Sequence, residues 1–189
     1  QWLTSGAMNG LTNGNRQSIF YSLGCNANYF DDPYCDCIAE YFVHNPTGGG
    51  VAFTGNTRLG WYTPGDPFSL SSQYDDAWWR SLFIDNAYHL GATLADSKND
   101  TQPYDDYMRY IFWELTLLGE PEMPIWTSTP TPMDVNCSST IPIGTQEFTV
   151  TVSYQGKAIS GALVCLRKPG EVYVYGLNDG SGGVTFTIN

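Results

Sequence analysis

The chain has 189 residues, which is enough for one large domain or two modest ones. Its 8 Lys and Arg against 19 Asp and Glu give a net charge of −11, which argues against nucleic acid and anionic membranes as partners, since both are bound through basic patches. Aromatic residues make up 15% of the chain, so it can pack a core, and no apolar run approaches the ~20 residues of a membrane-spanning helix.

A strand, a helix and a second strand are predicted in succession over the first part of the chain. Residues 18–23 form an apolar, aromatic run typical of a short buried strand, and residues 51–54 predict a second strand. Between them, Pro33 is placed to open a helix that carries Cys37 on its apolar face. This order is typical of a βαβ unit with parallel strands.

Two longer helices are predicted next. Residues 75–94 have apolar positions at helical spacing, with Trp78 and Leu82 among the candidate buried side chains. Residues 104–118 show the same spacing, and Gly119 is a suitable residue to end that helix. Helices and strands together predict an α/β region over residues 1–127.

The composition changes at residues 128–132, a stretch of Pro and Thr that predicts a stiff linker. From residue 133 to 189 the pattern has period two, clearest at residues 148–152, with Gly-rich turns between short strands. This pattern is typical of a β-sandwich. Because about 57 residues follow the linker where a full sandwich takes roughly 100, we expect a small variant or one that lacks its final strands.

Cys25 is the most informative single residue. It follows Gly24 directly after the first predicted strand, where α/β folds place reacting groups. A thiol at this place could be a nucleophile. It could also be a buried structural cysteine, since free Cys is among the most buried residue types, and position alone favours that interpretation.

Several short segments, in this order and spacing, resemble the gingipain-like cysteine peptidases (peptidase family C25). The resemblance covers nearly the whole chain and includes the β region that follows the linker. The segments are Ser22-Leu23-Gly24-Cys25, Cys37-Ile38-Ala39-Glu40, residues 55–62 and Leu117-Leu118-Gly119-Glu120-Pro121-Glu122-Met123-Pro124.

The resemblance implies a caspase-like catalytic domain, with a mainly parallel sheet flanked by helices and incomplete in this chain, followed by a small immunoglobulin-like β-sandwich. It implies a secreted or cell-surface cysteine endopeptidase that acts on polypeptides. Cys25 would be the nucleophile, and the backbone at Gly24 and Cys25 would hold the oxyanion. Thr57, Trp61 and Tyr62 would belong to the substrate pocket, although ordinary packing explains Trp61 and Tyr62 equally well.

The general base of the family is a His followed by Gly, and this chain departs from that pattern. Its two histidines, His44 and His89, do not precede Gly. The resemblance is therefore to the C-terminal half of the catalytic domain, and the N-terminal half of the same domain is an expected partner that supplies the base. We expect the fragment alone to be inactive and to expose a sheet edge. The alternative is a non-catalytic surface or secretion-associated protein that keeps the peptidase fold.

The sequence assigns no metal ligands and requires no cofactor, but structural calcium could bind at paired carboxylates. Helix capping explains these pairs more simply. A zinc site is a further alternative, although its Cys spacing is not the usual one, and the competing interpretation is a core Cys37 and an exposed Cys35. The carboxylate pairs are Asp31-Asp32, Asp75-Asp76 and Asp105-Asp106, and the zinc set is Cys25, Cys35, Cys37 and His44.

Two further assignments stay open at this point. Cys137 and Cys165 could form a disulfide across the sandwich, as in antibody domains. Arg58 could orient the substrate or an acidic neighbour, or it could belong to a structural ion pair.

Overall fold

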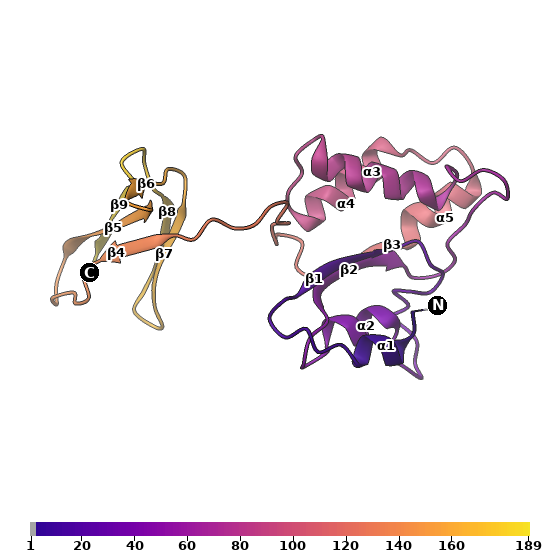
Figure 1. The fold of residues 1–189 in the computed structure, drawn as a ribbon, viewed down its shortest axis with the longest axis horizontal. Helices are drawn as coiled ribbons and strands as arrows, with labels where there is room; N and C mark the ends of the chain where they lie inside the picture. The colour runs from indigo at the N-terminus through magenta and orange to yellow at the C-terminus, as the bar shows by residue number, and fades with distance from the viewer. Residues whose placement is uncertain (1–2) are drawn as a thin grey trace. The chain divides into compact units, whose positions relative to one another are not determined.

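The computed structural model describes residues 3–189, which form two compact units that divide between residues 126 and 127 (Figure 1). The first unit contains every tryptophan of the chain, and the second is built of strands alone. Among the described residues, no helix is long and apolar enough to cross a membrane.

A three-stranded sheet lies at the centre of the first unit. Its strands are β1 (Ser18–Ser22), β2 (Gly50–Asn56) and β3 (Leu115–Leu118), in the order β1-β2-β3. The β1–β2 pair is parallel, with Tyr21 opposite Thr54, so the expected βαβ unit is present. The β2–β3 pair is antiparallel, so the described sheet is mixed rather than mainly parallel.

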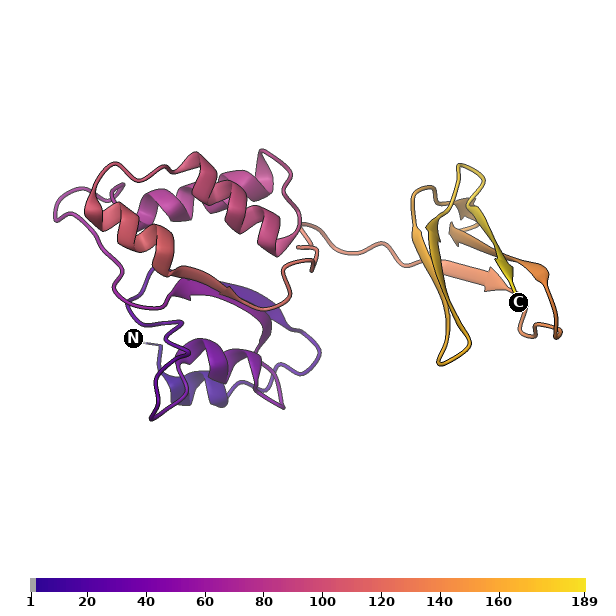
Figure 2. The same ribbon diagram turned by 180° about the vertical axis from the view of Figure 1, so that it is seen from behind.

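Helices cover both faces of this sheet (Figures 1 and 2). The helices α1 (Ser5–Asn9) and α2 (Ile38–Val43) lie on one face. The opposite face is covered by α3 (Ser71–Phe83), α4 (Leu90–Asp100) and α5 (Asp106–Glu114). The period of two along β2 explains this arrangement, because Phe53 packs towards α2 whereas Ala52 packs against α3 and α4.

The predicted start of α2 at Pro33 is wrong. The helix begins at Ile38, because the Glu40 carboxylate turns back to accept a hydrogen bond from the Cys37 N–H at 2.8 Å and so defines the first turn. Cys37 is buried beneath this turn, whereas Cys35 lies exposed in the preceding loop.

The single helix expected over residues 75–94 is two helices, α3 and α4. The chain turns between them at Asn86, which has a left-handed backbone with φ 61°. His89 then forms an isolated bridge with Pro124, and the Ile125 N–H donates to the Tyr88 carbonyl. Pairing with a segment more than thirty residues further along the chain therefore overrides local helix propensity.

The helix expected over residues 104–118 is also too long. It ends at Glu114, and the last four residues form β3, in which Leu115 pairs with Asn56 and Leu118 with Phe53. The apolar residues of this segment fit both the spacing of a helix and the alternation of a strand. The free edge of β2 offers a ladder of hydrogen bonds that a fourth helical turn could not use.

The second unit has two sheets around one apolar core. One sheet contains β4 (Asp134–Cys137), β5 (Gln146–Tyr154), β6 (Lys157–Ala158) and β9 (Gly183–Ile188), with β5 paired to each of the others. The other is the hairpin of β7 (Leu163–Lys168) and β8 (Val172–Leu177). As the period of two predicts, Phe148, Val150 and Val152 are buried. The core is completed by Phe186 and Ile188, with Val164, Leu166, Val172, Val174 and Val184 packed against it.

The disulfide considered between Cys137 and Cys165 is not formed. Both cysteines are free and exposed. Cys165 lies between the inward-facing Val164 and Leu166, so its side chain is on the outer face of its sheet, whereas Cys137 pairs with the inward-facing Val150 and shares the face of that residue.

Candidate functional site

Three chain segments meet at the edge of the sheet where the parallel strands end. β1 ends at Ser22 and is followed by the Cys25 loop, which we define as residues 23–31. β2 ends at Asn56 and is followed by residues 57–60. β3 runs in the opposite direction, so its first residue, Leu115, pairs with Asn56 at this same edge. Open α/β sheets bind ligands at the carboxyl ends of their parallel strands.

Cys25 is exposed on a sharp turn of this loop. Its Sγ donates to the Gly60 carbonyl at 3.5 Å, and the next residue, Asn26, has a left-handed backbone with φ 55°. The Asn26 N–H donates to the Arg58 carbonyl at 2.5 Å. A strained non-glycine residue persists only where its surroundings hold it, and such residues cluster at functional sites. The burial that the lone sequence position favoured is therefore not observed.

Two buried asparagines fix the base of the site. Asn28 is fully buried, and its side-chain amide donates to both the Thr116 carbonyl at 3.1 Å and the Thr116 Oγ1 at 2.8 Å. Its backbone N–H donates to the Asn56 carbonyl at 3.0 Å, and the Asn56 amide donates to the Leu23 carbonyl at 3.4 Å. These bonds tie the Cys25 loop to the ends of β2 and β3. Neither residue was predicted from the sequence, because their partners Thr116 and Leu23 lie far away along the chain.

Gly60 allows the Cys25 loop and residues 57–60 to approach each other closely. A Cβ atom added at this position would lie 2.2 Å from the Leu23 carbonyl oxygen and 3.1 Å from the Asn56 side chain. Only glycine fits such a contact between backbones. The sequence singled out the run that contains Gly60 but assigned this residue no role.

Arg58 forms an ion pair with Asp31 across the same gap. Its NH1 and NH2 atoms donate to the two carboxylate oxygens of Asp31 at 2.9 and 2.8 Å, and NH1 also donates to the Thr57 carbonyl at 2.9 Å. The guanidinium lies 4.4 Å from the centre of the Tyr29 ring. Hydrogen bonding from Arg58 lowers the pKa of the Asp31 carboxyl and keeps it ionised. This ion pair fits two of the roles left open for Arg58, the contact with an acidic neighbour and the structural ion pair.

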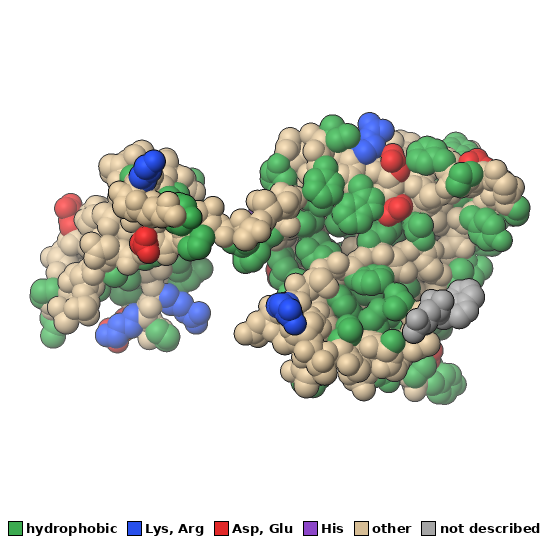
Figure 3. Space-filling model, in the orientation of Figure 1, with side chains coloured by type: hydrophobic (Ala, Val, Ile, Leu, Met, Phe, Trp, Pro, Cys, Tyr) green, Lys and Arg blue, Asp and Glu red, His purple; other side chains and the backbone are tan. Residues whose placement is uncertain are grey.

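The three residues expected to line a substrate pocket lie in different surroundings. Thr57 is half-buried, and its N–H donates to the Glu114 carbonyl at 2.9 Å. Trp61 packs on the Tyr107 ring at 4.7 Å and belongs to the core beneath α5, although its indole Nε1 is buried without a hydrogen-bond partner among the described residues. Tyr62 is 75% exposed. Figure 3 shows how many hydrophobic side chains reach the surface of both units.

Glu114 is a second acidic group at this edge. Its Oε2 atom is buried without a hydrogen-bond partner in the described chain. Burial raises the pKa of the Glu114 carboxyl, and this effect outweighs the hydrogen bond from the Leu59 N–H and the charge of Arg58, which lower it. The folded protein thus holds this proton more tightly than the unfolded chain does.

We expect Glu114→Gln to change how the stability of the first unit depends on pH. Because the folded-state pKa is raised, this carboxyl stabilises the fold below its ordinary pKa, and the contribution is lost as pH rises through the folded value. Relative to the parent, the variant should therefore become more stable as the pH rises above about 4, the ordinary pKa of a Glu side chain. Urea unfolding followed by tryptophan fluorescence measures this difference. An identical pH dependence in both proteins would contradict the assignment.

Both histidines lie at the end of the sheet opposite to the one that carries Cys25. His44 caps the C-terminus of α2, which runs back from the Cys25 edge and ends where Phe42 meets Gly49 and Gly50 at the start of β2. His89 bridges to Pro124, beyond the end of β3, and that end pairs with Phe53 rather than with Asn56. Neither histidine of this chain is therefore placed to act on Cys25.

The metal candidates of the sequence are not brought together. Among the described residues, the one set of three or more potential ligands that converges is Asp85, Asp96 and Asp100, which shares no member with the predicted carboxylate pairs or with the zinc set. The zinc interpretation is wrong, because Cys37 is buried under α2 whereas His44 lies at the far end of that helix. Asp105 instead caps α5 by accepting a hydrogen bond from the Met108 N–H at 2.8 Å.

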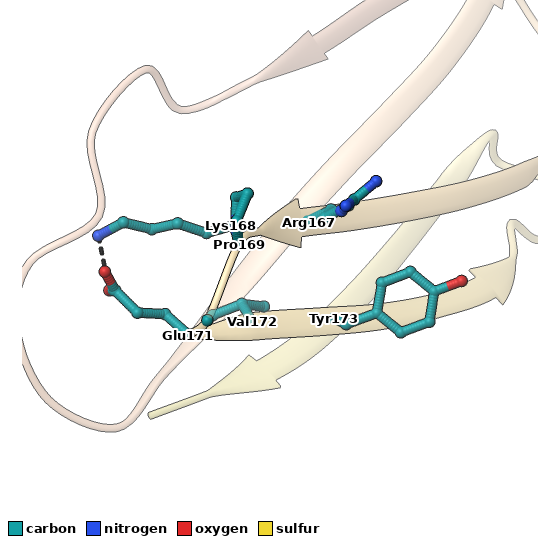
Figure 4. A pocket seen from close by; sticks show the side chains of 7 residues that line it. Arg167, Lys168, Pro169, Glu171, Val172 and Tyr173 are labelled. Carbon is teal, nitrogen blue, oxygen red and sulfur yellow. Dashed lines mark ion pairs between the residues drawn. The ribbon is translucent and has the colours of Figure 1, made fainter.

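Two surface hollows occur away from Cys25. One lies at the β7–β8 turn in the second unit, where Figure 4 shows the ion pair between Lys168 and Glu171 at 2.6 Å. The other lies between α3 and the end of α4, next to Arg80 and Asp100. Neither of these two hollows gathers a nucleophile and a base.

A comparison of the sequence with models of protein families identifies the family of this chain. The model of peptidase family C25 matches residues 1–126 and so ends at the last residue of the first unit. The chain belongs to peptidase family C25. The family expected from the short segments is thereby confirmed, and the chain is a cysteine-peptidase-related protein. Comparison with curated proteins gave no match.

Solved structures share the fold. The crystal structure of the Arg-specific cysteine proteinase gingipain R (RgpB) is 21% identical, with a TM-score of 0.72 over 98% of this chain and 42% of that chain. The complex of the RgpB pro- and mature domains of Porphyromonas gingivalis is 20% identical, with a TM-score of 0.71 over 98% of this chain and 43% of that chain. The chain thus spans less than half the length of the structures it matches.

Proposed function

We propose that Cys25 is the nucleophile of a secreted or cell-surface cysteine endopeptidase. The observation that best supports this proposal is the exposed thiol of Cys25. It lies on a strained turn at the carboxyl ends of the parallel strands β1 and β2, in a chain of family C25. A structural cysteine needs neither exposure nor a left-handed neighbour. A nucleophile needs both access to the substrate and a fixed orientation.

The backbone at Cys25 fits the chemistry of peptide hydrolysis. The thiolate attacks the carbonyl carbon of the scissile bond, and the developing oxyanion needs N–H donors aimed at it. The Gly24 N–H already donates to the Ser22 Oγ at 3.1 Å, whereas in the described chain no hydrogen bond occupies the Cys25 N–H. We therefore assign the donor role to Cys25 rather than to Gly24. Thr57 and the exposed Tyr62 lie on the segment that follows β2 and are proposed to contact the polypeptide substrate.

The general base is proposed to come from the N-terminal half of the same catalytic domain, which is not in this chain. Both histidines present lie at the opposite edge of the sheet, which supports this assignment. That base would take the thiol proton and return it to the leaving amine, after which water would hydrolyse the thioester. Strand β1 pairs on one side only within the described chain, so its other edge is open to further strands.

Two finer assignments accompany the proposal. The second unit is an immunoglobulin-like sandwich of reduced size, supported by its two sheets and shared core. No cofactor is required for the chemistry, and structural calcium would be held by carboxylates such as Asp85, Asp96 and Asp100.

The assignment of Cys25 as the nucleophile is tested in a longer protein that contains the N-terminal half. Two quantities are measured, the rate of thiol alkylation and the peptidase activity. We expect Cys25 to react with iodoacetamide faster than Cys137, which is exposed on β4 and serves as the internal reference. Cys25→Ser should abolish peptidase activity, whereas Cys137→Ser should preserve it. Equal labelling rates for the two thiols would contradict the assignment.

The second candidate is a non-catalytic surface or secretion-associated protein that keeps the peptidase fold. His44 and His89 lie at the other end of the sheet from Cys25, and this placement favours the non-catalytic candidate if no other base is supplied. In that case the coding sequence upstream would lack a His-Gly pair, and Cys25→Ser would change no activity.

A further inference from the structure

Arg58 contacts the Cys25 loop through both its backbone and its side chain, as Asn56 and Thr116 do at the base of the site. We propose that Arg58 is a positioning residue for the Cys25 thiol, because its carbonyl holds Asn26 next to the thiol and its guanidinium holds Tyr29 and Asp31 further along the loop. This inference rests on the proposed nucleophile, but the contacts of Arg58 with the loop are observed independently of any activity.

The backbone contact lies directly beside the thiol. The Arg58 carbonyl accepts a hydrogen bond from the Asn26 N–H at 2.5 Å, and two residues later the Gly60 carbonyl accepts from the Cys25 Sγ at 3.5 Å. The orientation of residues 58–60 therefore determines where the thiol lies. Because Asn26 has φ 55°, the turn depends on such external contacts to keep its shape.

The side-chain contact lies at the other end of the loop. The planar guanidinium reaches both oxygens of Asp31 and stacks over Tyr29, so it holds the loop at positions four and six residues after the thiol. The fork of Arg matches a carboxylate in a way that the single ammonium of Lys does not. The same NH1 atom also donates to the Thr57 carbonyl, which fixes the guanidinium relative to its own backbone.

The pair orients the loop more than it stabilises the fold. The Arg58 and Asp31 side chains are 44% and 51% exposed, and ion pairs of this exposure contribute little to stability. A small gain in stability is compatible with a large effect on a reaction, because a misplacement of about 1 Å can cost on the order of 100-fold in rate. Recognition of an acidic substrate by Arg58 is a weaker explanation, since Asp31 already occupies both of its terminal nitrogens.

The experiment compares Arg58→Gln and Asp31→Asn with Arg109→Gln. Arg109 is a matched control, because it forms an exposed ion pair with Asp106 at 3.0 Å on α5. Hydrogen exchange of the Asn26 amide is measured in the 189-residue chain, and kcat and KM are measured in the longer protein. We expect exchange at Asn26 to accelerate about tenfold or more in the first two variants, with a fall in kcat and little change in KM.

Rescue separates positioning from a general loss of structure. The reversed pair, Arg58→Asp with Asp31→Arg, should recover part of the lost protection and of kcat, and Arg58→Lys should fall between the parent and Arg58→Gln. The proposal would be overturned if Arg58→Gln and Asp31→Asn showed the same hydrogen exchange at Asn26 and the same kcat as the Arg109→Gln control. If the parent protein shows no activity, the proposed function fails, and exchange at Asn26 still decides whether Arg58 holds the loop.

Discussion

Gly60→Ala is expected to disrupt the candidate site more than any other single methyl group added to the chain near Cys25. The new Cβ would lie 2.2 Å from the Leu23 carbonyl oxygen, a backbone atom that cannot rotate away. The Cys25 loop and residues 57–60 must then separate, and the Gly60 carbonyl must leave the Cys25 Sγ. Peptidase activity of the longer protein should fall on the order of 100-fold, as expected for a reacting group displaced by about 1 Å.

Gly6→Ala is the matched control for this experiment. Gly6 lies in α1 of the same unit, and a Cβ there meets only the Thr4 hydroxyl at 3.9 Å, which is ordinary contact. The control should keep full activity and the parent labelling rate at Cys25. Parent-like activity in Gly60→Ala would show that the close approach of the two segments is not needed for the chemistry.

Trp78→Ala is expected to cause the largest loss of stability in the first unit. Trp78 is 2% exposed, lies between the sheet and α4, and packs against Tyr21 at 5.5 Å between ring centres. Truncation of such a side chain leaves a cavity and costs about 3–5 kcal/mol in free energy of unfolding. Because all the tryptophans lie in the first 126 residues, urea unfolding followed by tryptophan fluorescence reports this unit alone.

Phe148→Ala is the control in the other unit. Phe148 is 6% exposed in the core of the β sheets, and no tryptophan lies in that unit. Its tryptophan transition should match that of the parent protein, while far-ultraviolet circular dichroism reports a less stable β unit. A loss in free energy of unfolding of less than about 1 kcal/mol in Trp78→Ala would contradict the central role of this side chain.

The candidate site illustrates which residues a sequence can single out. Cys25 was identified by its place after a strand, and the family by short segments around it, and neither required coordinates. Arg58 was identified as a charged residue, but its partner Asp31 lies 27 positions earlier, and no local pattern couples the two. The roles of Asn28 and Gly60 were missed for the same reason, since their contacts are with Thr116 and Leu23.

The errors in the helices have a related cause. Residues 75–94 and 104–118 carry apolar residues at helical spacing, and that spacing is correct for most of both segments. The breaks at Asn86 and at Leu115 arise where another part of the chain offers hydrogen bonds, from Pro124 in one case and from β2 in the other. Propensity is a weak preference, and a free strand edge outweighs it.

By itself the sequence determined the alternation of strand and helix and the change to strands after the linker, which depend on periodicity and residue type, both local properties of a chain. The resemblance of its short segments indicated the family and singled out Cys25 as the candidate nucleophile. The tertiary structure alone decided that the thiol is exposed, that Arg58 holds its loop, and that His44 and His89 face the other edge of the sheet. Those features depend on which distant segments pack together, and packing is settled by the whole fold at once.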